Sequence, residues 1–116
     1  NDTSCHAIGD KVWQIVAQRL DVQARTEDTV CRYGGDEFLY LLVNPRSINN
    51  IQLIAGGVFE RISEPLMIDG LALAVAPSIG IAVYPDHGDT GPELVTNADA
   101  AMYRAKKLKS GFLLFE

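Results

Sequence analysis

The tetrad Gly34-Gly35-Asp36-Glu37, placed between two apolar runs, constrains the fold of this chain more than any other feature of its sequence. Val30 and Tyr33 precede the tetrad, and residues 38–43 after it are almost all apolar. Glycine and acidic residues at such a position are typical of a tight turn between antiparallel strands. Segment 29–43 is therefore predicted to form a β-hairpin whose second arm is buried.

Apolar side chains recur at helical spacing in three other segments of the chain. The first amphipathic helix is predicted over 10–25. A second helix begins near residue 48 and must end before Pro65, although Gly56-Gly57 costs it about 1 kcal/mol per glycine in helix propensity. The third helix is predicted from Pro92, a favoured first-turn residue, to about residue 107.

Two further segments are predicted to be extended. Residues 66–68 and 71–84 flank Asp69-Gly70, a strong turn signal, and are expected to form a second hairpin. Residues 112–115 are expected to form a closing strand. The order helix, hairpin, helix, hairpin, helix, strand contains no internal repeat and no linker, so residues 1–116 are expected to form one domain.

Hairpins that alternate with helices favour an α+β fold with a mostly antiparallel sheet, covered by helices on at least one face. A first strand before Asn1 would complete a ferredoxin-like core. We therefore expect the chain to be the larger part of such a domain, without its N-terminal strand.

The composition excludes several classes of protein. A hydrophobic fraction of 47% and a charged fraction of 22% are those of a globular domain, and a net charge of -5 argues against binding of a nucleic acid polymer through its backbone. No apolar run approaches the roughly 20 residues of a membrane span. Cys5 and Cys31 are too few and too far apart for a disulfide framework or a zinc site. A cytoplasmic domain with reduced thiols is expected, and an anchored parent protein is compatible with this.

The tip of the first predicted hairpin is the strongest candidate for chemistry. Glycines let another molecule approach the backbone closely, while Asp36 and Glu37 offer hard oxygen ligands that suit magnesium beside a nucleotide phosphate. Without further information, an ordinary tight turn explains the same residues.

The string Gly-Gly-Asp-Glu-Phe across a strand, turn and strand resembles the signature of the GGDEF family, the diguanylate cyclase domains. Other segments are similar to the same family. Asn1, Asp2, His6 and Gly9-Asp10 follow its pattern N-D-x-x-G-H-x-x-G-D, 78–82 resembles its central strand, and 98–106 resembles its last helix. The resemblance covers the whole chain and implies a nucleotidyl-cyclase-like, ferredoxin-like fold.

The resemblance also implies roles for single residues. Asn1, His6 and Asp10 match the region that recognises GTP, in which Asn1 and Asp10 would hydrogen-bond the guanine base. A helix cap is the alternative role of Asp10, and it could serve as both.

At the hairpin tip, Asp36 matches the acidic position that binds metal and assists attack by the 3′-hydroxyl, and Glu37 matches its metal-binding neighbour. Gly34 and Gly35 leave room for the phosphates. Lys106 matches a lysine that contacts phosphate, although a lysine on the outer face of a helix is more often simply solvated.

Arg25 and Asp28 form an R-x-x-D pattern that ends five residues before the glycine pair. In the GGDEF family this spacing marks the inhibitory site, where the product cyclic di-GMP binds as a stacked dimer. The planar guanidinium of arginine can stack on guanine and hold a phosphate. A local ion pair is the simpler explanation of the same four residues.

Some positions depart from the family pattern. Cys5 stands where glycine is usual, beside the expected guanine pocket, and Ser110 stands where many active members have a basic residue. The family's first strand carries an aspartate that completes the metal site, and that strand would precede Asn1. The 116-residue chain by itself is therefore predicted to be inactive and poorly stable.

The leading hypothesis is a diguanylate cyclase domain that condenses two GTP into cyclic di-GMP and two pyrophosphates. It would act as a homodimer and use Mg, or Mn in its place. Sensory or EAL domains in the parent chain would control it. The alternative is a catalytically inactive GGDEF module that binds GTP or cyclic di-GMP and controls an attached EAL phosphodiesterase. An unrelated nucleotide-binding ferredoxin-like domain is a third possibility.

Overall fold

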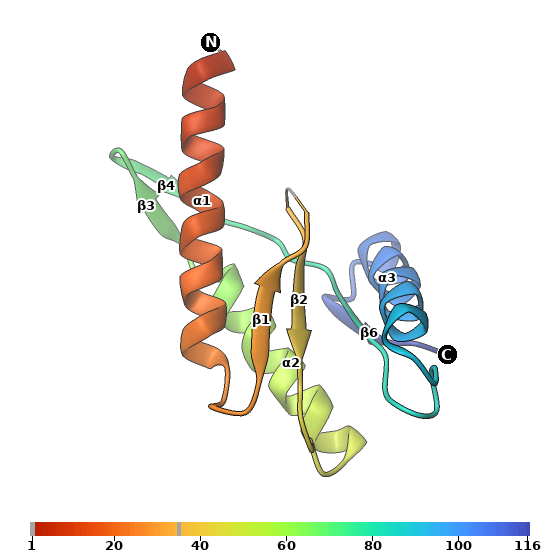
Figure 1. Cartoon of the computed structure of the whole chain (residues 1–116). Coiled ribbons are helices and arrows are strands. Elements are labelled where there is room, and N and C mark those ends of the chain that lie inside the picture. Colours follow the sequence, from red (N-terminus) through yellow and green to blue (C-terminus); the bar gives the residue numbers. More distant parts are fainter. Residues whose placement is uncertain (1, 35) are drawn as a thin grey trace. The chain divides into compact units, whose positions relative to one another are not determined.

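The computed structural model describes the backbone of residues 2–34 and 36–116, and the side chains of residues 8–34 and 36–116. The chain divides into two compact units, Asn1–Val75 and Ala76–Glu116. The first unit contains α1 (Asp2–Gln23), β1 (Thr29–Arg32), β2 (Phe38–Leu41), α2 (Ile48–Ser63), β3 (Leu66–Ile68) and β4 (Leu71–Leu73), and the second contains β5 (Ile79–Ile81), α3 (Gly91–Leu108) and β6 (Phe112–Leu114) (Figure 1). The mixed helices and small sheets confirm the predicted α+β class.

Helix α1 is longer than predicted, because it begins at Asp2 and not near residue 10. No proline interrupts residues 2–9, and an acidic residue in the first turn is favourable at the positive end of the helix dipole. Asp10 therefore lies inside the helix, and its predicted role as a helix cap is wrong. The buried side of α1 carries Val16 and Leu20, which belong to the core of the first unit.

The first hairpin is confirmed. Strands β1 and β2 pair antiparallel from Thr29↔Leu41 to Arg32↔Phe38. The prediction of a buried second arm is wrong, because residues 38–40 are half-buried and Leu41 is 60% exposed. In the described part of the chain β2 pairs only with β1, and Phe38 contacts the ring of Trp13 on α1. The hairpin is thus covered on one face by a helix.

Helix α2 has the predicted bounds. Ser47 is its N-cap, with Oγ accepting a hydrogen bond from the amide of Asn50, and Ile51, Ala55, Val58 and Ile62 are its buried residues. The glycine pair does not interrupt it. At Gly57 a Cβ would lie 2.9 Å from Nε2 of Gln23, the end of a flexible side chain from the last residue of α1 that can move aside.

Arg19 of α1 binds the C-terminal end of α2. Its guanidinium donates hydrogen bonds to the carbonyl oxygens of Glu64 (2.6 Å) and Pro65 (3.0 Å), and more weakly to those of Arg61 and Ile62. A cation at this end of a helix satisfies carbonyls that have no partner in the helix and interacts favourably with the helix dipole. Arg19 therefore ties α1 to the C-terminal end of α2, beside the apolar core of the first unit.

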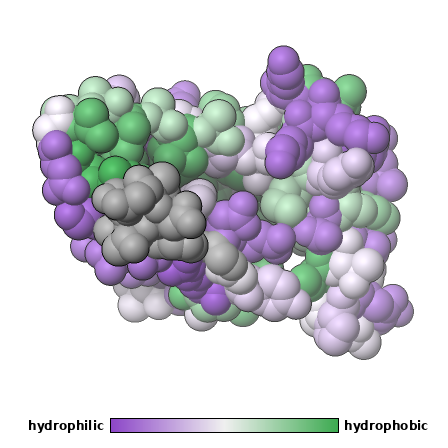
Figure 2. All heavy atoms as spheres, turned by 90° about the horizontal axis from the view of Figure 1, so that it is seen from above, coloured by the Kyte–Doolittle hydropathy of each residue, from purple (hydrophilic) through white to green (hydrophobic). Residues whose placement is uncertain are grey.

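The second predicted hairpin is correct only in its first part. Strands β3 and β4 pair antiparallel, and Asp69 and Gly70 adopt positive φ angles of 51° and 82°, as the turn signal predicts. The hairpin lies beside α1 (Figure 1). Lys11 of α1 forms an ion pair with Asp69 at the hairpin turn, at 3.0 Å. From above, hydrophobic atoms gather on this side of α1 (Figure 2), in agreement with the exposure of Met67 (65%) and Leu71 (51%).

The predicted second arm over 71–84 is split. Strand β4 ends at Leu73, and β5 is a separate strand that belongs to the second unit. Pro77 stands between the two strands, and its lack of an amide hydrogen disfavours an uninterrupted strand.

The second unit is a parallel βαβ arrangement, whereas the sequence predicts a mostly antiparallel sheet and gives the closing strand no pairing partner. Strands β5 and β6 pair in parallel from Ile79↔Phe112 to Ile81↔Leu114, and α3 connects them. Helix α3 begins after the N-cap Thr90, whose Oγ1 accepts a hydrogen bond from the amide of Glu93, and ends at Lys109 in the left-handed conformation. Its end and the closing strand agree with the predictions.

Gly80 permits the packing of α3 on β5. A Cβ at this position would overlap the carbonyl oxygen of Ala98 and the amide nitrogen of Met102, both of which belong to the backbone of α3. Ala101 and Ala105, the buried residues of α3, keep the contact equally close. The helix and the strand are therefore in backbone contact, which only glycine allows.

We predict that Gly80→Ala lowers the free energy of unfolding by about 1–3 kcal/mol, because α3 must move away from β5 to make room for the methyl group. The measurement is urea-induced unfolding of the protein. The control is Gly91→Ala, where a Cβ meets nothing within 4 Å, and its effect should stay within about 0.5 kcal/mol. Equal stability of the two variants would contradict the close packing.

Candidate functional site

The tip of the β1–β2 hairpin is closed by its backbone. The amides of Tyr33 and Gly34 donate hydrogen bonds to the carbonyl oxygen of Glu37, at 2.8 Å and 3.3 Å, and Arg32 Nε donates to the carbonyl of Gly34 at 3.2 Å. These bonds use main-chain groups at the tip and leave the side chains of Asp36 and Glu37 exposed. Gly35 lies outside the described residues.

Asp36 and Glu37 form no ion pair with any side chain that the structure describes. Nor does any group of three or more His, Cys, Asp and Glu residues within that part of the chain come close enough to hold a metal. Two exposed carboxylates nevertheless suit Mg²⁺, which proteins usually bind through one or two carboxylates together with water and substrate phosphates. The donor set thus fits a metal that arrives with a nucleotide better than a metal enclosed by protein alone.

The residues matched to guanine recognition lie along α1. Asp10 is exposed on this helix, and no ion pair involves it among the described side chains. His6 and Cys5 lie in the first turns of α1, but their side chains are outside the described residues, and so is all of Asn1. The structure places Asp10 alone of this set, as a carboxylate open to a ligand.

Lys106 is exposed in the last turn of α3, in the second unit. This position fits both a phosphate contact and a solvated side chain. Ser110, which replaces a basic residue of the family pattern, contributes to the end of α3: its amide donates to the carbonyl of Ala105 at 3.1 Å.

Arg25 and Asp28 form a bidentate ion pair, the simpler of the two explanations of their pattern. Arg25 Nε and Nη2 donate to the two carboxylate oxygens of Asp28, both at 2.9 Å. The pair also reaches the end of β2, because Asp28 Oδ1 accepts from the amide of Val43 at 3.2 Å and Arg25 Nη2 donates to the carbonyl of Val43 at 2.8 Å. The end of α1 is thereby joined to the open end of the hairpin that carries Asp36.

The Asp28 carboxylate is fully buried, whereas the Arg25 side chain keeps 33% of its surface exposed. The hydrogen bonds from Arg25 hold the pKa of Asp28 below the ordinary value of 3.8, despite the opposing effect of burial. The same ion pair raises the pKa of Arg25. Both residues are therefore charged at neutral pH.

Tyr40 is a polar residue of this region that the sequence analysis did not identify. Its hydroxyl is buried without a hydrogen-bond partner in the described part of the chain, and burial raises the pKa of the phenol. The negative charge of Asp28 raises this pKa further, while Arg25 opposes it. A tyrosine within an apolar strand was the only available signal.

Comparisons with known proteins agree with this arrangement. The family described as "Diguanylate cyclase, GGDEF domain" matches residues 1–111. The chain belongs to the GGDEF family, and the resemblance inferred from its motifs is confirmed.

Two relatives come from Pseudomonas aeruginosa. The bifunctional diguanylate cyclase/cyclic di-GMP phosphodiesterase MucR is 42% identical over 117 residues, which is 100% of this chain and 17% of MucR. The diguanylate cyclase TpbB of strain UCBPP-PA14 is 40% identical over 112 residues, or 96% of this chain and 26% of TpbB. The chain thus spans about a sixth to a quarter of the length of these relatives.

Solved structures show the same fold. The crystallised GGDEF domain of YfiN, or TpbB, from Pseudomonas aeruginosa matches with a TM-score of 0.93 at 39% identity. The match covers 100% of this chain and 73% of that one. An EAL/GGDEF domain protein from M. capsulatus has a TM-score of 0.90 at 35% identity, and covers 96% of this chain and 72% of that one. The fold is therefore the α+β, nucleotidyl-cyclase-like fold of GGDEF domains.

We predict that Asp28→Asn lowers stability at neutral pH and that this effect disappears in acid. Because the pKa of Asp28 is lower in the folded protein than in the unfolded chain, its contribution is complete above the unfolded value near 3.8 and is lost as the pH falls through the folded value. The measurement is the urea midpoint of both proteins between neutral and strongly acidic pH.

The control for this experiment is Glu27→Gln, because Glu27 lies 3.9 Å from the same guanidinium but is exposed. It should leave the urea midpoint nearly unchanged. A constant difference between wild type and Asp28→Asn at every pH would contradict the ionised, buried pair.

Proposed function

We propose that this chain is the GTP-binding and catalytic part of a diguanylate cyclase, which condenses two GTP into cyclic di-GMP and two pyrophosphates. One observation carries the proposal: in a member of the GGDEF family, the Gly-Gly-Asp-Glu-Phe string is intact, and its two carboxylates are exposed on a hairpin tip that its own backbone closes. In a turn with a purely structural role, the two carboxylates would have no need to stay free of ion pairs. A cytoplasmic location, where GTP is available, belongs to the same proposal.

Binding of GTP would use the residues that match the family's substrate positions. Asn1 and Asp10, with His6 nearby, would recognise guanine, since an amide and a carboxylate complement its O6 acceptor and its N1–H and N2–H donors. Gly34 and Gly35 would let the phosphates approach the backbone. Lys106 would neutralise phosphate charge with its exposed ammonium group.

The chemical step would depend on Asp36. Its carboxylate would accept the proton of the ribose 3′-hydroxyl while that oxygen attacks the α-phosphate of the second GTP and pyrophosphate leaves. Asp36 and Glu37 would hold a Mg²⁺ ion, or Mn²⁺ in its place. The bound ion supplies neutralisation of phosphate charge. Two hydroxyls and two α-phosphates must meet, so a homodimer with one GTP per domain is required for turnover.

We predict that Asp36→Asn reduces production of cyclic di-GMP from GTP and magnesium by at least about a hundredfold, since the amide cannot accept the proton and is a poor metal ligand. The measurement is chromatographic detection of cyclic di-GMP made by the full-length protein. Asp86→Asn, in an exposed loop of the second unit, is the matched control and should leave turnover unchanged. Unaltered turnover in Asp36→Asn would refute the cyclase mechanism.

We further predict that Asp10→Ala removes the preference for GTP over inosine triphosphate. In GTP, the exocyclic 2-amino group would donate a hydrogen bond to the Asp10 carboxylate, and inosine lacks this group. The wild type should therefore bind GTP at least about tenfold more tightly than inosine triphosphate. Calorimetric affinities for both nucleotides test this. Asp21→Ala changes another exposed carboxylate of α1 and should keep the preference.

Product inhibition at Arg25 and Asp28 is a further part of the proposal. The exposed third of the Arg25 side chain leaves surface on which guanine could stack, while its bonds to Asp28 keep the guanidinium plane fixed. Because the pair also binds Val43 at the open end of the hairpin, cyclic di-GMP bound there would act on the element that carries Asp36.

A catalytically inactive regulatory module is the second candidate function. Ser110 favours it, because the serine supplies no charge for a triphosphate and its amide completes the end of α3. Such a module would bind GTP or cyclic di-GMP and control an attached EAL or sensory domain. Tight GTP binding without turnover, in a full-length protein able to dimerise, would establish this function in place of the cyclase.

A further inference from the structure

The C-terminal half of α3 has an exposed face that combines cations with apolar groups. We call Tyr103, Arg104, Lys107 and Leu108 the cationic face. Tyr103 and Leu108 are 60% and 62% exposed, and Lys107 Nζ lies 4.9 Å above the centre of the Tyr103 ring. No ion pair in the described part of the chain involves Arg104 or Lys107. Exposed large apolar residues beside unpaired charges are typical of an interaction surface.

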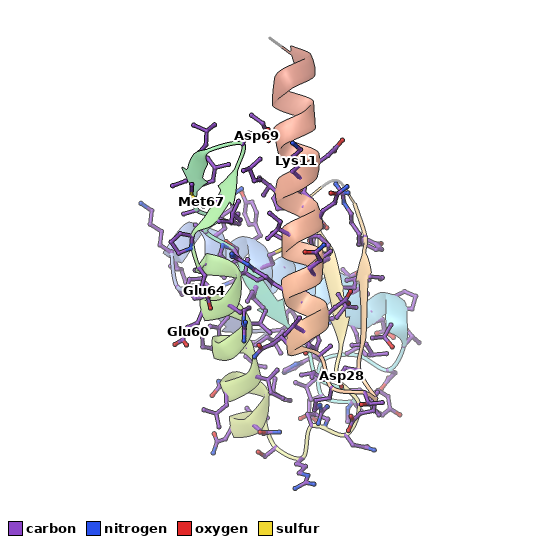
Figure 3. The ribbon with its side chains drawn as sticks, turned by 90° about the vertical axis from the view of Figure 1, so that its left-hand side faces the viewer. Lys11, Asp28, Glu60, Glu64, Met67 and Asp69 are labelled. Atoms are coloured by element: carbon purple, nitrogen blue, oxygen red, sulfur yellow. The ribbon has the colours of Figure 1, made fainter. Side chains whose placement is uncertain are left out.

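The first unit has a surface of the opposite charge and of similar design. We call Leu53, Glu60, Glu64 and Met67 the acidic stripe. Leu53 and Glu60 are two helical turns apart on one face of α2, and Glu64 is the C-cap residue that follows the helix. Glu60, Glu64 and Met67 follow one another along one side of this unit (Figure 3).

The apolar ends of the acidic stripe are exposed. Leu53 is 75% exposed and Met67 is 65% exposed, because Met67 alternates with the buried residues Leu66 and Ile68 in β3. Neither Glu60 nor Glu64 forms an ion pair with a side chain that the structure describes. Methionine adapts its shape readily to a partner surface.

The two surfaces complement each other in charge and in spacing. Each presents two charges between two exposed apolar residues. Arg104 and Lys107 are three residues apart on α3, which separates them by about 5–6 Å. Glu60, in the last turns of α2, and Glu64, its C-cap, are neighbours along the acidic stripe (Figure 3). Two ion pairs can therefore form at once, with the apolar residues packed on either side.

We propose that the cationic face of one copy of this chain binds the acidic stripe of a second copy. The contact is heterologous, because it joins two different surfaces, and repeated contacts produce a ring or an open chain of copies. It differs from the symmetric pairing that turnover requires and needs no nucleotide. The docking therefore stands independently of the proposed cyclase activity.

Two charge-reversal variants of the full-length protein test the contact without GTP. One is Arg104→Glu with Lys107→Glu, and the other is Glu60→Lys with Glu64→Lys. Sedimentation velocity at low salt should show self-association of the wild type, and high salt should weaken it. In each variant the association constant should be at least about tenfold lower. Mixing the two variants should restore association, since each then supplies the partner that the other lacks.

A matched control separates this contact from a general effect of net charge. Asp86→Lys with Asp89→Lys makes the same change in net charge as the reversal of the acidic stripe, but in a loop of the second unit. It should self-associate like the wild type. A monomeric wild type at low salt would overturn the proposal, and so would reversal variants that associate normally or mixtures that fail to associate.

Discussion

The ion pair of Arg25 and Asp28 is the interaction on which the candidate site depends. A two-stranded hairpin has little stability of its own, and β1 and β2 have only four residues each. The pair compensates for this by tying the end of α1 to Val43, where the hairpin opens, while Trp13 contacts Phe38 near its tip. Because the Asp28 side chain is buried, loss of Arg25 leaves an uncompensated charge inside the fold. The proposed function assigns product binding to the same two residues, so structure and regulation would then share one pair of side chains.

Much of the fold could be predicted from local signals. Signals that act over a few residues mark four elements correctly: Gly34-Gly35 for the first hairpin, Asp69-Gly70 for the second, Ser47 before α2 and Thr90 before α3. Longer-range features were missed. The apolar run 71–84 reads as one strand, although a proline divides it and its second part pairs in parallel with residues that are distant in sequence. The binding of Arg19 to the end of α2, and of the His87 ring to the amide of Val83 at 2.8 Å, left no local pattern at all.

For the candidate site, too, the sequence predicts residues but not their surroundings. Residue type and spacing predict which side chains carry the chemistry, because carboxylates, glycines and an arginine have few substitutes in their roles. They do not predict the environment that decides whether a side chain is free. Asp28 and Asp36 are both aspartates of the same hairpin region, yet one is buried in four hydrogen bonds and the other is exposed without an ion pair in the described part of the chain. Only the fold distinguishes a buried structural carboxylate from one that is exposed to ligands.

Helix α3 carries cations on more than one side of its exposed surface. Residues 103 and 107 are one turn apart and share a face, whereas Lys106 precedes Lys107 by about 100° of rotation around the helix axis. Under the two proposals, Lys106 would contact phosphate, and Arg104 and Lys107 would contact a second copy of the chain. The inward side of the same helix is limited to Ala101 and Ala105, which keep it against Gly80. Because that contact joins two backbones, it fixes the rotation of the helix and with it the directions in which its cations point. A glycine without chemistry of its own thus determines where the charges of this unit are presented.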